Sequence, residues 1–242
     1  MEWDEFVRIF SAKTVSLQKH LIPLYRMNYA AKRPEFVGTS VYCLYGKIRF
    51  VLTARHVFKQ IIPDRPWFQY SENEMRELQF EKYIIANDND LDVGVVVIEN
   101  DIPLFNPISY TYFGTFQDSK EYQHLLVGYP GSSTKRSTRH NQRIKFQAYL
   151  TTAASNEEYN RLKVDRTKKL IVSFKKEKVY NEEHNLITFP NPNGMSGGAV
   201  FQFNENNHNQ MYLVGVMTDW DVNRKNAIIA TRIECIDEFF RI

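Results

Sequence analysis

Hydrophobic residues recur along most of the chain in short alternating runs, the pattern of β-strands that bury one face. Residues 36–54 predict two strands joined at Tyr45-Gly46-Lys47, and further runs continue to residue 116. A polar stretch at 117–123 interrupts the pattern, and six more short runs follow it. Many short strands separated by turn residues predict β-barrels or a sandwich.

A helical period occurs only at the two ends. Trp3, Phe6, Val7 and Phe10 follow the i, i+3, i+4, i+7 spacing and predict a short N-terminal helix over residues 1–12. The segment "ECIDEFFRI" (234–242) predicts a closing helix. The interruption at 117–123 divides the strands into two halves, 13–118 and 119–242, whose similar strand content suits two similar barrels.

Composition is that of a globular protein and limits the choice of partner. The 242 residues are 43% hydrophobic and 24% charged, with a net charge of +3. The most basic segment, 133–143, is rich in Ser and Thr and predicts a solvated loop, which argues against a nucleic-acid partner. No window approaches the roughly 20 apolar residues of a membrane span, so no membrane contact is expected.

The start of the chain, "MEWDEFVRIF", lacks the basic and then apolar pattern of a secretory signal. The two cysteines, Cys43 and Cys235, are too few for a disulfide framework. Both features predict a cytoplasmic protein with reduced thiols, although a mature chain whose signal had been removed would look the same.

One serine stands among glycines in "NPNGMSGGAV" (191–200), directly before an apolar run. Glycines allow a tight turn that exposes a serine hydroxyl and directs backbone N–H groups to one side, as a nucleophile with an oxyanion site requires. A glycine-rich turn before a strand is also common without any function. Ser196 is therefore a candidate nucleophile only if a base and an orienting carboxylate accompany it.

The candidate base is His56 in "VLTARHVF", where an apolar strand ends and a helical turn can begin. The other five histidines lack this setting; His124, which precedes an apolar strand, suits a structural role. The candidate carboxylate is Asp92, which adjoins the apolar run "VGVVVI" and needs a partner if it is drawn inward. Asp90 is the alternative if the register differs by two.

The order His56, Asp92, Ser196 is one of three that the Ser-His-Asp arrangement takes in unrelated folds. With "GTSVY", "VLTARHVF", "DLDVGVVVI", "LLVGYPG", "GMSGGAVF" and "LVGVMTDW", the chain resembles the trypsin/chymotrypsin-fold serine peptidases, in particular their bacterial trypsin-like and heat-shock-protease-like branch. The resemblance covers about residues 13–240, the protease domain only.

This resemblance implies an all-β fold of two perpendicular six-stranded barrels, 13–118 with the histidine and aspartate and 119–242 with the nucleophile, flanked by the two short helices. It implies that the N–H groups of Gly194 and Ser196 form the oxyanion hole, and that no metal or cofactor is needed. Substrate-binding residues follow from the same resemblance: Pro190, Asn191, Met217, Thr218, Asp219 and Trp220. Pro190 and Met217 stand where relatives carry the residues that select basic or acidic side chains, so neither specificity is expected.

The leading hypothesis is thus an intracellular serine endopeptidase that acts through an acyl-enzyme on a protein or peptide substrate. The alternative is a pseudoprotease that binds peptides or proteins in the same cleft without turnover. Compact bacterial relatives often occur in stress or antiphage defence systems, so a regulatory or effector protein is a further partner to consider. The N-terminal helix and segment 153–185 are the candidate contact surfaces.

Overall fold

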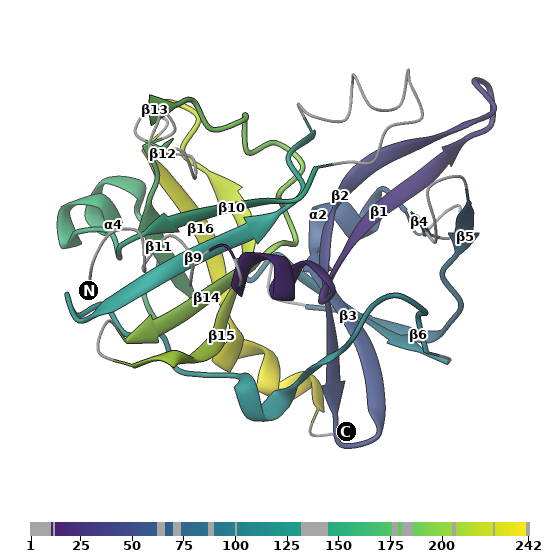
Figure 1. The fold of residues 1–242 in the computed structure, drawn as a ribbon, viewed down its shortest axis with the longest axis horizontal. Helices are drawn as coiled ribbons and strands as arrows, with labels where there is room; N and C mark the ends of the chain where they lie inside the picture. Colours follow the sequence, from purple (N-terminus) through teal and green to yellow (C-terminus); the bar gives the residue numbers. More distant parts are fainter. Residues whose placement is uncertain are drawn as a thin grey trace.

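The computed structural model describes residues 11, 13–61, 66–69, 74–86, 90–99, 101–131, 145–175, 179–180, 186–204, 207–224 and 226–240. Most of these residues form antiparallel β-structure, in two large sheets that lie side by side (Figure 1). The strands of one sheet come from the first half of the chain and those of the other from the second half.

The first sheet has eight strands in the order β5-β4-β1-β2-β3-β7-β6, with β8 added in parallel on β2. Its strands are β1 (Leu21–Asn28), β2 (Arg33–Tyr45), β3 (Ile48–Ala54), β4 (Trp67–Gln69), β5 (Met75–Glu77), β6 (Phe80–Ile85), β7 (Val93–Ile98) and β8 (Ile108–Ser109). The predicted hairpin over 36–54 is confirmed as β2 and β3, and Gly46 provides the positive φ of its turn.

The second sheet has six strands in the order β10-β9-β14-β15-β16-β11. They are β9 (Tyr122–Gly128), β10 (Gln147–Thr151), β11 (Lys169–Ser173), β14 (Ala199–Asn204), β15 (Asn207–Trp220) and β16 (Ala227–Arg232). A separate two-stranded ladder joins β12 (Val179–Tyr180) and β13 (Leu186–Ile187).

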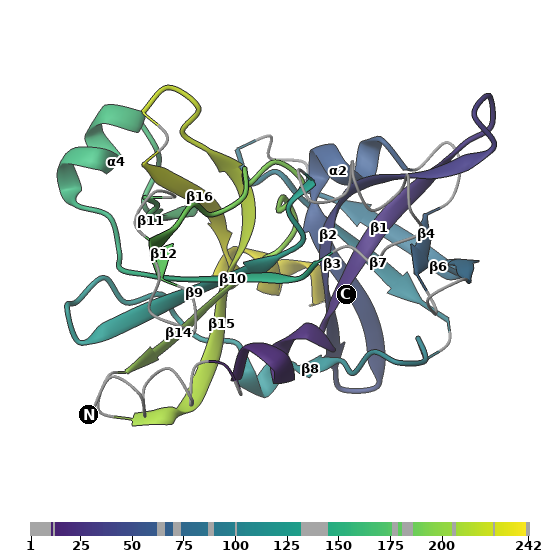
Figure 2. The same cartoon turned by 45° about the horizontal axis from the view of Figure 1, so that its top comes forward.

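The prediction of an all-β fold is confirmed as a mostly antiparallel β-fold, but two closed six-stranded barrels are not formed by the described strands. The first sheet has eight strands, and its end strands β5 and β6 do not pair. The second curls into a half-barrel whose edges meet where Ala153 bridges Val172, the Ala154 N–H donates to the Ile171 carbonyl and the Ser173 N–H donates to the Thr152 carbonyl. Pairing stops there because Ser155 caps the helix α4 (Asn156–Leu162), which carries the chain away from the sheet (Figure 2).

Helical structure is short. Besides α4, residues 13–18 are helical, α2 spans Arg55–Lys59, and 3₁₀-helices occupy η2 (Tyr110–Tyr112) and η4 (Ile233–Phe240). The predicted closing helix is therefore present as η4, whereas the strand expected over 108–116 ends after two residues and turns into η2. Apart from Ser11, the predicted helix over 1–12 lies outside the described residues.

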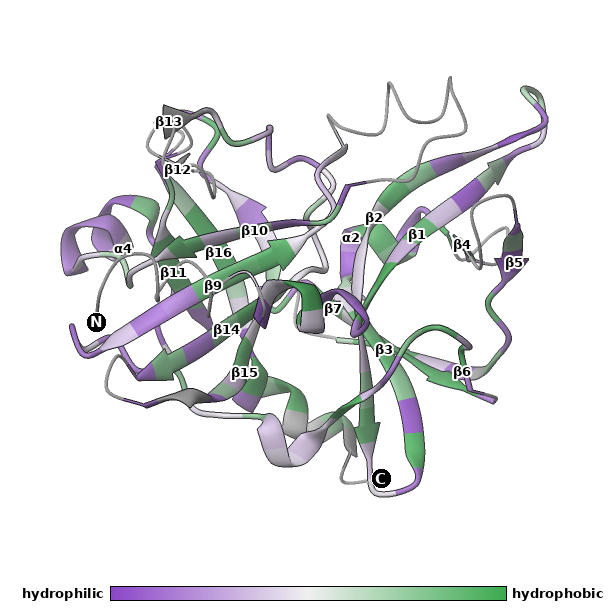
Figure 3. Cartoon of the chain, viewed as in Figure 1, coloured by the Kyte–Doolittle hydropathy of each residue, from purple (hydrophilic) through white to green (hydrophobic). Residues whose placement is uncertain are grey.

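The two sheets are held together by a shared apolar core. One cluster combines Leu21 and Val41 of the first sheet with Val127, Ala199 and Val216 of the second, all fully buried. Each sheet also packs its own cluster. Hydrophobic residues accordingly follow the strands, whereas α4 is largely hydrophilic (Figure 3). The interface between the two sheets is therefore closely packed and can hold nearby side chains in fixed positions.

Candidate functional site

His56 and Asp92 meet because of the register of the first sheet. Strand β3 pairs with β7 so that Ala54 lies opposite Val93, which brings together the residues just beyond that pair. The Arg55 N–H donates to the Asp92 carbonyl at 2.9 Å. Asp92 adopts a left-handed backbone conformation, with φ of +47°, at this junction. A non-glycine residue in that region is uncommon and is often found at functional sites.

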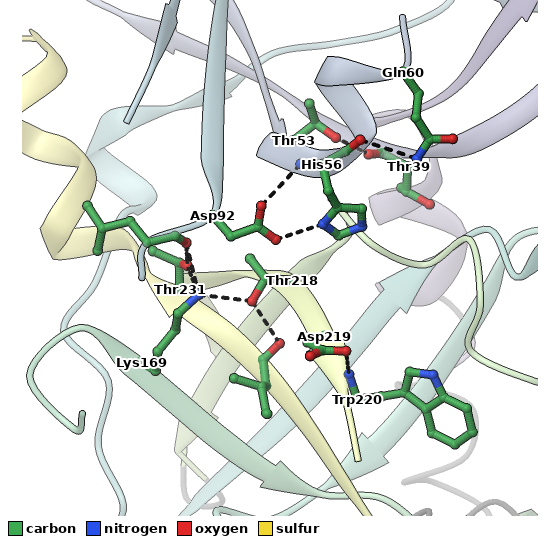
Figure 4. A network of polar contacts seen from close by, with 12 residues as sticks. Thr39, Thr53, His56, Gln60, Asp92, Lys169, Thr218, Asp219, Trp220 and Thr231 are labelled. Atoms are coloured by element: carbon green, nitrogen blue, oxygen red, sulfur yellow. Dashed lines mark hydrogen bonds and ion pairs between the residues drawn. The ribbon is translucent and has the colours of Figure 1, made fainter. Parts of the chain in front are cut away.

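Both carboxylate oxygens of Asp92 face His56 (Figure 4). Oδ1 accepts from the His56 backbone N–H at 3.1 Å, and Oδ2 lies 2.7 Å from His56 Nδ1. A carboxylate only accepts, so Nδ1 carries the proton and Nε2 is left as a basic nitrogen. The hydrogen bond to Asp92 raises the pKa of His56 above its usual value, against the opposing effect of burial. The alternative carboxylate, Asp90, is instead 3.6 Å from Lys168 and largely exposed.

Ser196 lies in a turn that only glycine can build. Gly194 and Gly197 have φ of +92° and +85°, in the left-handed region. A Cβ on Gly197 would stand 1.9 Å from the Thr39 carbonyl oxygen, and one on Gly198 would stand 2.5 Å from Met217 Cε. The turn is fixed to β15 by hydrogen bonds from Gly197 N–H to Met217 O and from Met217 N–H to Gly198 O, at 2.7 and 2.8 Å.

Two backbone N–H groups of this turn make no hydrogen bond within the described part of the chain. The Asn193 carbonyl accepts from the Gly131 N–H. This carbonyl and the Gly194 N–H belong to the same trans peptide, so the Gly194 N–H points in the opposite direction. Within the described part of the chain, neither the Gly194 nor the Ser196 N–H has an acceptor. Two such donors near a serine hydroxyl can stabilise an oxyanion.

Thr39 of β2 fixes the serine turn against the first sheet. Its N–H donates to the Ser196 carbonyl at 2.9 Å and its hydroxyl donates to the Gly194 carbonyl at 3.0 Å. Thr53 of β3, three residues before His56, donates in turn to the Thr39 carbonyl at 2.7 Å. Sequence reasoning missed Thr39 and Thr53, because their role depends on long-range backbone contacts.

The serine turn also lies beside the helix that carries His56. A Cβ on Gly38 would be 2.7 Å from Val57, the residue after His56, and 3.1 Å from the Ser196 carbonyl oxygen. Among the described residues, no hydrogen bond joins the Ser196 hydroxyl to the imidazole. Such bonds are often long without substrate and tighten in the substrate complex.

The residues expected to bind substrate continue β15 past its partner strand. Strand β14 begins at Ala199 opposite Val216, so Thr218, Asp219 and Trp220 extend beyond its end. The ladder to β16 shifts register between Met217 and Asp219, which leaves Thr218 out of the pairing. The carboxylate of Asp219 also helps to raise the pKa of His56.

The other expected substrate-binding residues lie on the segment before Ser196. Pro190 is half-buried and Asn191 is exposed. The Asn191 side chain accepts from the Asn193 N–H at 3.1 Å, and Asn193 Oδ1 accepts from the Trp220 indole at 3.0 Å. These hydrogen bonds link Trp220, at the end of β15, to the segment before Ser196.

A cationic residue that sequence reasoning missed lies next to Asp92. Lys169 of β11 donates to the Leu91 carbonyl and to the hydroxyls of Thr218 and Thr231 (Figure 4). A signal was available, because Lys169 adjoins the apolar run "LIVSF" as Asp92 adjoins "VGVVVI".

Neither a metal centre nor a membrane segment is found in the described ranges. No group of three His, Cys, Asp or Glu side chains there is arranged to hold a metal ion. No helix among those residues is long and apolar enough to cross a membrane.

The chain matches no model of a known protein family and no curated protein sequence. The mostly antiparallel fold with its half-barrel sheet is compatible with a chymotrypsin-like fold. A proposal of function must therefore rest on the geometry of the site.

Proposed function

We propose that the protein is a serine endopeptidase in which Ser196, His56 and Asp92 form the catalytic triad. The observation that carries the proposal is the pairing of both Asp92 oxygens with His56 beside a glycine-built serine turn that presents two unused N–H groups. These are the parts that acyl transfer requires: nucleophile, base, orienting carboxylate and oxyanion donors.

In this proposal, His56 Nε2 accepts the proton of Ser196 as its Oγ attacks the carbonyl carbon of a peptide bond. Asp92 holds the imidazole in the required tautomer and stabilises the imidazolium. The Gly194 and Ser196 N–H groups stabilise the oxyanion. His56 then returns the proton to the leaving amine, and water hydrolyses the acyl-enzyme by the same steps in reverse.

The substrate is proposed to be an extended polypeptide. Residues 218–220 of β15 lie past the end of β14, so their backbone offers an edge on which a peptide can pair as an added strand. Such pairing contacts the main chain and favours peptide substrates over small esters.

The proposal is tested with a fluorophosphonate, which reacts only with an activated serine. We expect labelling of the protein and none of Ser196→Ala, while Ser119→Ala, a control away from the site, labels normally. A proteome-derived peptide library digested in parallel should yield cleavage products only with the proteins that label. Labelling that persists in Ser196→Ala would refute the assignment. A folded protein that neither labels nor cleaves would favour the peptide-binding alternative.

A further inference from the structure

The ammonium group of Lys169, on β11 of the second sheet, contacts the segment that carries Asp92 next to the first sheet. Its Nζ lies 2.9 Å from the Leu91 carbonyl, 3.1 Å from Thr218 Oγ1 and 2.8 Å from Thr231 Oγ1. An ammonium has three protons, so these contacts use all of them. Leu91 immediately precedes Asp92, and Thr218 belongs to the proposed substrate-binding edge.

A lysine in this position is costly, because burial disfavours its charge. Burial lowers the pKa of Lys169 to about 8, even though neighbouring acids oppose the shift. The titratable groups that face it from the surrounding elements are Asp92, Asp219, Asp90 and Cys235, together with the His56 imidazole. A neutral amide offers only two N–H donors, so no neutral side chain would satisfy all three oxygens from one atom as the ammonium does.

The charge acts on His56. Asp92 and Asp219 both favour the imidazolium, whereas Lys169 disfavours it. A general base must be unprotonated at the working pH to accept a proton. The cation thus offsets two carboxylates that would otherwise keep His56 protonated at higher pH.

We propose, on the basis of the peptidase function proposed above, that Lys169 is a positioning residue which fixes Leu91–Asp92 against Thr218 and keeps His56 available as a base. Its three hydrogen bonds set the position of the carboxylate relative to the substrate edge. Its charge extends to lower pH the range in which His56 Nε2 is free, against the larger effect of Asp92. Both effects disappear when the side chain is neutral and cannot donate.

Three variants separate these effects. Lys169→Met removes charge and donors, Lys169→Gln removes the charge but keeps an amide donor, and Lys168→Met is the control. Lys168 is adjacent but pairs with Asp90 at 3.6 Å and makes none of the three contacts. His56 is titrated by imidazole ¹⁵N NMR, which needs no turnover, and kcat and KM are measured from pH 5 to 9.

Both Lys169 variants should raise the pKa of His56 and move the acidic limb of kcat/KM to higher pH, whereas Lys168→Met should change neither. At a pH above the His56 titration of every variant, as the NMR titration locates it, Lys169→Met should still lose about 10-fold in kcat from misplacement, and Lys169→Gln less. In the unmodified protein, the His56 resonance should show a second inflection near pH 8, as Lys169 loses its proton.

The inference is overturned if both variants titrate at His56 like the Lys168→Met control. If neither variant folds, the unmodified protein decides: a His56 resonance that titrates in a single step over the pH range in which Lys169 loses its proton overturns the inference. Failure of the peptidase proposal is distinct, because it is seen as absent fluorophosphonate labelling, while the NMR titration still reports the influence of Lys169 on His56.

Discussion

Gly197→Ala is expected to force the serine turn away from the first sheet, because the structure leaves no room for a Cβ at this position. A methyl group there would lie 1.9 Å from the Thr39 carbonyl oxygen and 2.2 Å from Thr53 Oγ1. Both atoms belong to the first sheet, and the nearer one is backbone. To reach the 3.0 Å that real Cβ contacts respect, the serine turn and the first sheet must separate by about 1 Å.

Gly46→Ala is the matched control. Gly46 also has a positive φ, of +59°, but a Cβ on it would meet nothing within 4 Å. Both variants incur the strain of a left-handed alanine, about 1–2 kcal/mol. Only Gly197→Ala adds the collision, which should bring its loss of unfolding free energy to about 3 kcal/mol or more.

The two variants should also differ in activity. A separation of about 1 Å strains the hydrogen bond from the Thr39 N–H to the Ser196 carbonyl and displaces Ser196, the proposed nucleophile, from His56. Misplacement on this scale costs about 10² in rate. Urea denaturation gives the stability, and the rate of fluorophosphonate labelling, measured where both variants are folded, gives the activity. Equal losses of stability, with a normal labelling rate in Gly197→Ala, would refute the reasoning.

Two further predictions address titration. Asp92→Asn should lower the pKa of His56, since it removes the largest cause of its elevation. It should also slow labelling by about 10⁴, the loss that the corresponding change causes in Ser-His-Asp enzymes. NMR titration and labelling kinetics measure both effects, and an unchanged labelling rate would exclude Asp92 from the proposed triad. His124 is fully buried, and burial lowers its pKa from 6.5 to about 4. Below pH 6.5 the unfolded chain therefore binds a proton at His124 that the folded protein does not bind, and the free energy of unfolding should fall by about 3 kcal/mol between pH 7 and pH 4. Urea denaturation of His124→Gln should lack this loss, and identical pH profiles of stability for the two proteins would contradict its assignment to His124.

Local features of the fold could be predicted from the sequence because they depend on neighbouring residues. The hairpin of β2 and β3 follows from alternation around Gly46, and the helical turn at His56 follows from the end of an apolar strand. His124 adjoins an apolar run in the sequence, and it lies fully buried within β9.

Features that depend on contacts between distant segments could not be predicted. Closure of the second sheet fails because α4 begins right after β10, and the polar segment that forms α4 carries no strong helical period. The three partners of Lys169 lie 49 to 78 residues away in sequence. Sequence spacing gave the order of His56, Asp92 and Ser196, but their distances depend on how the two sheets dock.

Docking of the sheets and assembly of the site are therefore the same event. His56 and Asp92 lie on segments that adjoin strands of the first sheet, whereas Ser196 precedes β14 and Thr218 lies on β15 of the second. The shared apolar core attracts the two sheets to each other, but it does not fix their relative position to a fraction of an ångström. Directional hydrogen bonds provide that precision at two points of the interface: Thr39 against the serine turn, and Lys169 against the segment that carries Asp92. A change at either point should impair the proposed catalysis at a smaller stability cost than opening the core, because it alters alignment and leaves the burial of apolar surface almost unchanged.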